Sequence, residues 1–324
     1  MRAVVLRSHG GPDVLQVEEV PDPAPGPEEV LVDVVAVGLN RADLLQRMGF
    51  YPGPPMAHEI PGLEFSGRVA AAGPRAVQWE PGDAVMGIVG GGAYAERLVV
   101  HERQAVAVPG TVELADGAAI PEVFITAWDA LVVQGGLTSG RWALVHAGAS
   151  GVGTAAVQVA KAIGARVAVT TSVGKLARCR DLGADLVIER SPHDWLGELR
   201  QHVLGGIDVV LDVVGGDEVD RNIDALATKG RIVQVGTLTG GGRADVGKLL
   251  RKRAAVIGTL LRARPIEEKI AITQRFAQEV VPLFETGVVR PVVDRRFALA
   301  EAPDAHRYME SNTNVGKILL DVNP

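Results

Sequence analysis

The sequence predicts an α/β protein in which a doubly wound parallel sheet of six strands is inserted into a partly open β-barrel. Three observations carry this prediction. β-type runs fill the first 120 residues, strands and helices alternate from about residue 122, and barrel-like strands return after about residue 265. We therefore expect one domain formed by residues 1–121 and 266–324, and a second formed by residues 122–265.

The composition is that of a globular protein without nucleic-acid or membrane partners. Of 324 residues, 47% are hydrophobic and 22% are charged, and the formal net charge of -6 comes with no cluster of Lys and Arg for phosphate binding. Polar residues or Gly interrupt every apolar run, and the first residues lack a signal-peptide pattern, so we expect a cytoplasmic protein. The single cysteine, Cys179, can form neither an intramolecular disulfide nor a thiolate-rich metal site.

The first 120 residues indicate antiparallel barrel strands. Pro and Gly separate short runs, several of which alternate apolar and polar residues as strands with one buried face do. The runs are RAVVLR, LQVEEV, EEVLVDVVAVGLN, GRVAAAG, DAVMGIV, YAERLVV and AVAVP. One helical insert, ADLLQRM at 42–48, interrupts them.

The middle of the chain indicates a parallel sheet. Runs that are mostly apolar on both faces alternate with helical stretches, which is typical of a sheet covered by helices on both sides. The strands are expected at 142–147, 165–171, 185–188, 207–214, 231–237 and 255–261.

The last sixty or so residues are expected to rejoin the first domain. A long amphipathic helix is predicted over 266–287, followed by the run VVRPVVDRRFALAEA, a short helix APDAHRYMES and the terminal run GKILLDV. The two β-type runs are more similar to barrel strands than to the apolar strands of the parallel sheet.

The segment HAGASGVG at 146–153 is the clearest functional feature. It follows the strand predicted at 142–147 and opens a helix, which is where a dinucleotide-binding (Rossmann) sheet holds the pyrophosphate. Gly151 and Gly153 would let a pyrophosphate approach the backbone and the helix approach the strand, and the helix N-terminus offers free N–H groups. The alternative is an ordinary tight turn between a strand and a helix.

The strand after this turn ends without an acidic residue. Its tip carries Thr171 and Ser172, with Lys175 three residues on and no carboxylate before Asp181. A carboxylate there would bind the free ribose diol of NADH and would repel the 2′-phosphate of NADPH. The sequence therefore predicts NADPH as the cofactor. The missing acid carries this prediction more than Lys175 does, because a solvated helix lysine is equally ordinary.

Six segments, taken in order, carry a family resemblance: GLNRADLLQRMGFYPGPP, IPGLEFSGRV, AAIPEVFITAW, HAGASGVGTAAVQ, GTLLRAR and NVGKILL. The chain resembles, essentially from end to end, the zinc-free quinone oxidoreductases of the medium-chain dehydrogenase/reductase superfamily, close to the p53-inducible type. This resemblance implies a GroES-like barrel domain and a Rossmann domain with the cofactor in the cleft between them. It also implies a homodimer, joined by sheet edges across AVIGTLL.

Zinc-dependent members of that superfamily hold a catalytic metal with a Cys, with the His of a Gly-His-Glu run and with a further Cys or Glu. The matching run here is Gly62-Leu63-Glu64, and Asn40 and Arg41 occupy the region of the first ligand. Leucine cannot bind zinc, and no thiolate replaces the Cys. We therefore expect no metal. Without a Lewis acid, the expected substrate is an acceptor already activated by conjugation.

The candidate catalytic residues are Tyr51, Asn40 and Ser150. By resemblance, Tyr51 lies near the nicotinamide and the substrate, where it would orient the acceptor or stabilise oxyanion charge; otherwise its ring packs on neighbouring prolines. Ser150 contacts either the substrate or the phosphate and ribose of the cofactor. The expected cofactor contacts are Thr126, Ala149, Ser150, Gly151, Val152, Gly153, Thr171, Ser172, Lys175, Arg190, Gly236, Leu260, Leu261 and Lys317. Arg190 replaces a Tyr of many relatives and either binds the 2′-phosphate or faces solvent.

The leading hypothesis is an NADPH-dependent, metal-free quinone oxidoreductase. A reductase of activated C=C bonds in enones or enals would use the same site. A third hypothesis is a cofactor-binding structural or RNA-binding protein, as some relatives resembling lens crystallins are, but the net negative charge disfavours it.

Overall fold

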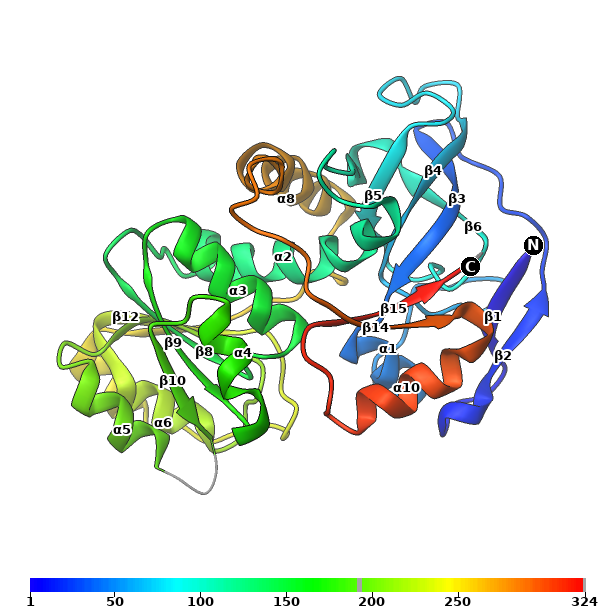
Figure 1. The fold of residues 1–324 in the computed structure, drawn as a ribbon. Coiled ribbons are helices and arrows are strands. Elements are labelled where there is room, and N and C mark those ends of the chain that lie inside the picture. The colour runs from blue at the N-terminus through cyan, green and yellow to red at the C-terminus, as the bar shows by residue number, and fades with distance from the viewer. Residues whose placement is uncertain (191–193, 323–324) are drawn as a thin grey trace. The chain divides into compact units, whose positions relative to one another are not determined.

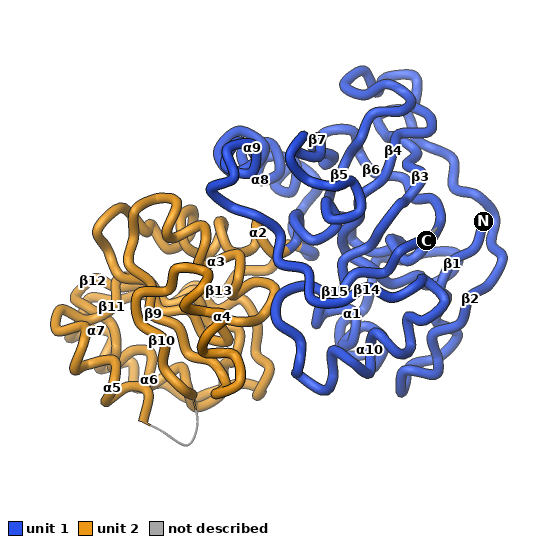
Figure 2. Tube along the Cα trace, in the orientation of Figure 1, with its two compact units in different colours: residues 1–122, 262–324 blue, residues 123–261 orange. Residues whose placement is uncertain are grey.

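The computed structural model describes residues 1–190 and 194–322, and the chain divides into two compact units (Figure 2). Unit 1 comprises Met1–Glu122 and Arg262–Pro324, and unit 2 comprises Val123–Leu261. The chain therefore leaves unit 1 once and returns to it once. The domain limits inferred from the sequence remain a prediction.

Unit 1 is built on a seven-stranded sheet in the order β14-β15-β3-β4-β5-β7, with β6 pairing with β3. A separate antiparallel pair is formed by β1 and β2. The strands are β1 (Arg2–Leu6), β2 (Leu15–Glu19), β3 (Glu29–Gly38), β4 (Glu64–Ala72), β5 (Ala84–Ile88), β6 (Arg97–His101), β7 (Ala105–Ala107), β14 (Val293–Ala298) and β15 (Lys317–Asp321). The prediction of a barrel domain is confirmed.

Strand β3 is the central element of unit 1. Val30, Val32 and Val34 alternate with more exposed residues and contribute to the largely aliphatic core of the unit. β3 pairs antiparallel with β4, β6 and β15, and the last of these pairings joins Val37 to Leu320. The predicted return of the chain to its first domain is therefore confirmed.

The helices of unit 1 range from 5 to 14 residues. They are α1 (Arg41–Arg47), α8 (Ile266–Glu279), α9 (Val281–Glu285) and α10 (Ala302–Glu310). The single helix expected over 266–287 was wrong, because the structure breaks it at Val280. Pro282 explains the break, since a proline has no N–H to donate and is tolerated only in the first turn of a helix. Short 3₁₀ helices are η1 (Pro12–Val14), η2 (Glu102–Gln104), η3 (Leu114–Ala119) and η6 (Leu299–Glu301).

Unit 2 contains a six-stranded parallel sheet in the order β10-β9-β8-β11-β12-β13 (Figure 1). The strands are β8 (Trp142–His146), β9 (Arg166–Thr171), β10 (Leu186–Glu189), β11 (Ile207–Asp212), β12 (Leu226–Gln234) and β13 (Ala255–Gly258). The order reverses between β8 and β11, and ligands of doubly wound sheets bind beyond the carboxyl ends of the strands at that point. The predicted doubly wound sheet is confirmed.

Helices cover both faces of this sheet, with α3 and α4 on one side and α5 and α6 on the other (Figure 1). Trp195, the first residue of α5, is fully buried in the core of the unit, and its indole N–H donates to Glu218 of α6 over 2.8 Å. The helices and turns of the unit are α3 (Gly151–Ala162), η5 (Val173–Lys175), α4 (Leu176–Asp181), α5 (Trp195–His202), α6 (Glu218–Ala225) and α7 (Val246–Lys252). Helix α2 (Pro121–Trp128) begins at the boundary of the units and continues as the π-helical η4 (Asp129–Gln134).

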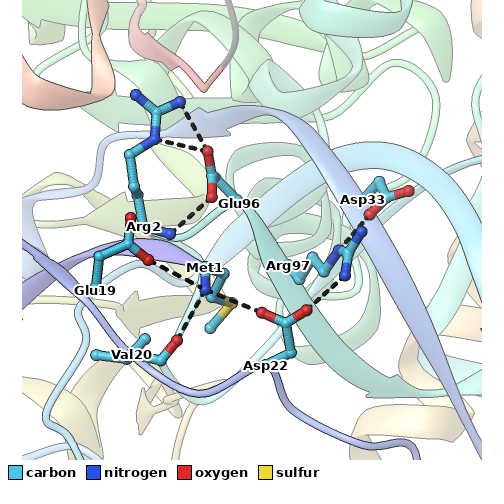
Figure 3. A network of polar contacts seen from close by, with 8 residues as sticks. All are labelled: Met1, Arg2, Glu19, Val20, Asp22, Asp33, Glu96 and Arg97. Carbon is cyan, nitrogen blue, oxygen red and sulfur yellow. Dashed lines mark hydrogen bonds and ion pairs between the residues drawn. The ribbon is translucent and has the colours of Figure 1, made fainter.

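A network of charged side chains ties the β1–β2 pair to the sheet of unit 1 (Figure 3). The α-amino group of Met1 donates to Val20 O over 2.8 Å and lies 3.0 Å from the carboxylate of Asp22. Asp22 also binds Arg97 of β6, which reaches Asp33 of β3 over 2.8 Å. Exposed ion pairs of this kind each contribute little, so we expect the network to set orientation more than stability.

Candidate functional site

The glycine turn of unit 2 joins β8 to α3. Ser150 caps the helix, since its Oγ accepts from the Gly153 N–H over 3.0 Å and its carbonyl accepts from the Thr154 N–H over 2.8 Å. In the described structure, the N–H groups of Gly151 and Val152 have no protein acceptor. These two amides, together with the positive end of the helix dipole, form a site for an anionic oxygen.

Two glycines of this turn are required by packing. A Cβ atom on Gly153 would lie 2.3 Å from Ala147 O, and one on Gly148 would lie 2.6 Å from the Cβ of Val169. Both distances are far below van der Waals contact, so any side chain would push α3 away from the sheet. Gly153 therefore allows the helix to pack closely on the strand. Its N–H already donates to Ser150 Oγ and is not available to a ligand.

The tip of β9 carries the residues expected at the 2′-phosphate. Thr171 is buried, Ser172 is exposed, and the N–H of Arg190 donates to Thr171 O over 2.8 Å. The structure thus brings Arg190 to the same sheet edge as Ser172. Sequence reasoning missed Glu189, which is the register partner of Thr171 on β10. Its position is visible only once β9 and β10 are paired.

A buried chain of hydrogen bonds lies under the carboxyl ends of β8, β9 and β11. His146 Nδ1 lies 2.8 Å from Thr170 Oγ1, and His146 Nε2 lies 2.7 Å from Asn222 Oδ1. Asn222 Nδ2 donates to Asp212 Oδ2 over 3.0 Å. Because the Asn222 nitrogen donates to a carboxylate, its oxygen accepts, which assigns the proton of His146 to Nε2.

The chain of hydrogen bonds ends on the loop that follows β11. Asp212 Oδ1 accepts from the N–H groups of Val214 and Gly215, over 2.6 and 3.1 Å. Gly215 and Gly216 both have positive φ, 71° and 59°, which residues with side chains rarely adopt. Asp212 therefore fixes the conformation of the loop at the sheet edge where the cofactor is expected.

The remaining predicted contacts in unit 2 lie on three elements. Thr126 is a buried residue of α2, and Gly236 is the second residue after the end of β12. After β13, Leu261 is buried whereas Leu260 is exposed. Thr259, just before them, donates from Oγ1 to Asp129 Oδ2 over 3.1 Å, which ties this segment to η4.

In unit 1, Asn40, Glu64 and Lys317 form a buried cluster. Asn40 Nδ2 donates to Glu64 Oε1 over 2.8 Å and to Gly38 O over 3.1 Å, while Asn40 Oδ1 accepts from Lys317 Nζ over 2.8 Å. Lys317 Nζ also lies 2.7 Å from Glu64 Oε1 and donates to Leu39 O. An ammonium has three donors, and these three oxygens account for all of them.

Tyr51 lies in an irregular loop after α1, and Arg262 is its main neighbour. The Arg262 guanidinium carbon lies 4.8 Å from the centre of the Tyr51 ring, and Arg262 Nη1 donates to Tyr51 O over 3.1 Å. Burial and the carboxyl group of Glu122 raise the pKa of Tyr51, against a smaller lowering by Arg262. The phenol is therefore protonated at neutral pH and can donate a hydrogen bond.

Two carboxyl groups of unit 1 have raised pKa values. Burial, and then the nearby Glu64, raise the pKa of Glu122 to about 8. Burial also raises the pKa of Asp43 to about 6, although Asp43 accepts from Asn40 N over 2.8 Å and from the Tyr94 hydroxyl over 3.1 Å. Sequence reasoning missed Arg262 and Glu122, because they lie far from Tyr51 in the chain.

The described residues contain no candidate metal site and no candidate membrane span. Among residues 1–190 and 194–322, no group of three or more His, Cys, Asp or Glu side chains is arranged to hold a metal ion. Within the same residues, no helix combines the length and the apolar character needed to cross a membrane.

Known protein families match segments of both units. The alcohol dehydrogenase GroES-like domain family matches residues 26–110, and the zinc-binding dehydrogenase family matches residues 182–320. The synaptic vesicle membrane protein VAT-1 homolog of Rattus norvegicus is 30% identical over 344 residues, which cover 100% of this chain and 85% of that protein. The chain is a medium-chain dehydrogenase/reductase.

Solved structures of similar proteins carry several descriptions. An NAD-dependent alcohol dehydrogenase is 32% identical to this medium-chain dehydrogenase/reductase, with a TM-score of 0.89 and 100% of both chains covered. The quinone oxidoreductase of Escherichia coli complexed with NADPH is 28% identical, with a TM-score of 0.90 and coverage of 99% and 100%. The CurK enoyl reductase is 26% identical, with a TM-score of 0.89 and 99% of both chains covered. The fold and the superfamily are thus common to proteins with different substrates.

Proposed function

We propose that this medium-chain dehydrogenase/reductase is an NADPH-dependent, metal-free oxidoreductase that reduces quinones or related conjugated carbonyl compounds. The observation that carries the proposal is the edge of the parallel sheet, where the two free amides of Gly151 and Val152 meet an acid-free strand tip at Ser172. The similarity to the E. coli quinone oxidoreductase, which was crystallised with NADPH, supports it.

The residues of unit 2 fit NADPH. The free amides at the start of α3 suit the pyrophosphate, and the exposed Ser172 and Arg190 suit the 2′-phosphate, with Lys175 close in sequence. Glu189, opposite Thr171, would oppose a phosphate, so Arg190 is expected to be the decisive charge. Bound NADPH would supply a hydride to the acceptor.

In unit 1 we propose Tyr51 as the residue that orients the acceptor. Its phenol remains protonated at neutral pH and is only partly buried, so it can donate to the acceptor oxygen. Both ends of the Asn40 amide are engaged, which makes its expected role supporting. Ser150 Oγ accepts from Gly153, and its hydroxyl proton is free for the cofactor or the substrate.

The cluster around Glu64 supports the metal-free part of the proposal. Lys317 already compensates the charge of this buried carboxylate, and Asn40 occupies another of its acceptor positions. A metal ion at Glu64 would have to displace that ammonium, and no thiolate or imidazole is at hand among the described residues to complete the ligand set.

The deciding experiment follows NADPH oxidation with a panel of ortho- and para-quinones beside enones and enals, with and without a strong zinc chelator. We expect turnover with quinones that the chelator does not change. Turnover restricted to enones and enals would replace the proposal with the alternative, reduction of activated C=C bonds, which the similarity to the CurK enoyl reductase favours. Tight NADPH binding without turnover of any acceptor would favour the third hypothesis.

We also propose a homodimer formed through the free edge of the parallel sheet. β13 is an edge strand of the sheet. Val256 within β13 is 42% exposed, and Leu260, two residues after the strand, is also exposed. An exposed apolar edge strand is a template for pairing with a second copy. Sedimentation of Val256→Lys should then report a monomer where the parent chain is a dimer, and a monomeric parent chain would remove the proposal.

A further inference from the structure

The segment that carries Tyr51 has little structure of its own. We define the Tyr51 loop as residues 50–57. Three of its residues, Pro52, Pro54 and Pro55, have no N–H to donate. In the described structure, residues 51–57 take part in a single hydrogen bond, from Arg262 Nη1 to Tyr51 O. Arg262 therefore supplies the one hydrogen bond that holds the backbone of this segment among the described residues.

Arg262 itself is held from three directions. Its Nε donates to Gly90 O over 2.7 Å, its Nη1 to Tyr51 O over 3.1 Å, and its Nη2 to Gln46 Oε1 over 2.7 Å. Gln46 is buried in α1, where its Nε2 donates to Glu59 over 3.1 Å. The guanidinium thus joins α1, the Tyr51 loop and the glycine turn at 90–92, all within unit 1.

We propose that Arg262 is a positioning residue, which clamps the Tyr51 loop in the conformation that presents the Tyr51 hydroxyl to the electron acceptor. The planar, forked guanidinium is what allows one side chain to reach three acceptors on three segments while stacking on a ring. That Arg262 holds the loop is inferred from these contacts alone. That the held loop places Tyr51 at the acceptor rests on the proposed function.

Four variants test the clamp. Arg262→Met removes both the positive charge and the guanidinium donors. Arg262→Lys keeps the charge but not the forked arrangement of donors. Gly53→Ala leaves Arg262 in the chain but places a Cβ 2.7 Å from its Nη2, which displaces the flexible end of the side chain. Gly91→Ala is the matched control, because its Cβ would lie 3.4 Å or more from every neighbour, including 3.6 Å from the same Nη2.

The first readout is backbone 15N relaxation at Tyr51, Met56 and Ala57, which needs neither enzymatic activity nor a hydrogen-bonded amide. We expect the order parameters of these amides to fall by about 0.2 or more in Arg262→Met, Arg262→Lys and Gly53→Ala relative to the parent chain, and not to change in Gly91→Ala. Lysine does not rescue the loop, since a single ammonium cannot reach all three acceptors. Should Arg262→Met fail to fold, Gly53→Ala carries the test.

The second readout separates positioning from general loss of structure. When the loop is loose, the acceptor must order it on binding, which raises KM about fivefold or more and leaves kcat within about twofold. A purely structural defect would lower the active fraction, and so kcat, without this selective effect on KM. If no acceptor is turned over, the proposed function fails while the order parameters of the loop still decide the clamp.

The third readout is the alkaline titration of tyrosine absorbance, with Tyr51→Phe identifying one of only three tyrosines in the chain. Burial is the largest influence on the pKa of Tyr51 and raises it, so Arg262→Lys, which keeps the positive charge but loosens the loop, should lower that pKa. A lower pKa at unchanged charge would therefore report that the ring of Tyr51 has become more exposed. Parent-like order parameters and a parent-like KM in both Arg262→Met and Gly53→Ala would overturn the proposal.

Discussion

The ammonium of Lys317 and the carboxylate of Glu64 form a buried ion pair, with Nζ and Oε1 2.7 Å apart and the side chains 3% and 0% exposed. Lys317→Met would leave a buried carboxylate without its counter-charge. We expect the free energy of unfolding in urea to fall by about 3–5 kcal/mol. The double variant Lys317→Met with Glu64→Gln should recover much of the loss, because no charge is then left unpaired.

The same double variant tests the role in cofactor binding that family resemblance assigns to Lys317. Its ammonium is already satisfied by three oxygens of unit 1. The structural role therefore predicts an NADPH dissociation constant within about twofold of the parent value. A loss of affinity of tenfold or more in the folded double variant would restore Lys317 as a cofactor contact.

Glu122 should make stability fall as pH rises. Its pKa is raised from 4.5 to about 8 in the folded protein, so the folded state holds a proton that the unfolded state loses first. The contribution of the protonated carboxyl group to stability is fully present below about pH 4.5. It is lost as the pH rises from about 4.5 to about 8. Glu122→Gln removes this dependence. Urea unfolding should find the variant more stable than the parent at pH 8.5 and equally stable at pH 4.5; parallel profiles would contradict the assignment.

The hydrogen-bond chain through His146 should be sensitive to loss of Asn222. Asn222→Leu removes the partners of both His146 Nε2 and Asp212 Oδ2, and each buried polar group left unsatisfied costs about 1–3 kcal/mol. We expect unfolding in urea to be easier by about 2–5 kcal/mol. Thr170→Val, at the other end of the chain, leaves only His146 Nδ1 without its partner and should cost about 1–3 kcal/mol, less than Asn222→Leu. Equal effects of the two substitutions would contradict a connected chain.

Ser172→Asp should weaken the preference for NADPH over NADH. Ser172 is exposed at the end of β9, where a carboxylate repels a 2′-phosphate and binds a free ribose diol. The ratio of dissociation constants, measured by fluorescence titration, should shift by about tenfold or more. Arg190→Ala is a companion variant that should shift the ratio in the same direction. If neither variant changed this ratio, the 2′-phosphate would not bind at the tip of β9.

The order of helices and strands was accessible from the sequence because burial leaves a local pattern. The strand expected at 207–214 is β11, since its apolar residues are buried on both faces. The helix over 266–287 was extended too far because apolar periodicity continues through Pro282, while the backbone cannot. Local patterns thus fix the type of an element better than its ends.

The candidate site was accessible only where it is local in sequence. The glycine turn needs no information beyond residues 146–153, whereas Arg262 reaches Tyr51 across 211 residues and Lys317 reaches Asn40 across 277. Such pairs depend on strand order and register, which no short window contains. The role of Lys317 at the cofactor stays a prediction from resemblance, because a motif shows which residue recurs and not which atoms it contacts.

The pairing of β3 with β15 sets an order for folding during synthesis. The strands of unit 2 follow one another without interruption, so its sheet can assemble as soon as they leave the ribosome. β3 instead waits for β15, and the whole of unit 2 is made in between. Until then residues 36–38 at the end of β3 present an open edge to other nascent chains. The domain translated first is therefore the last to be completed, and it is the one that chaperones would have to protect.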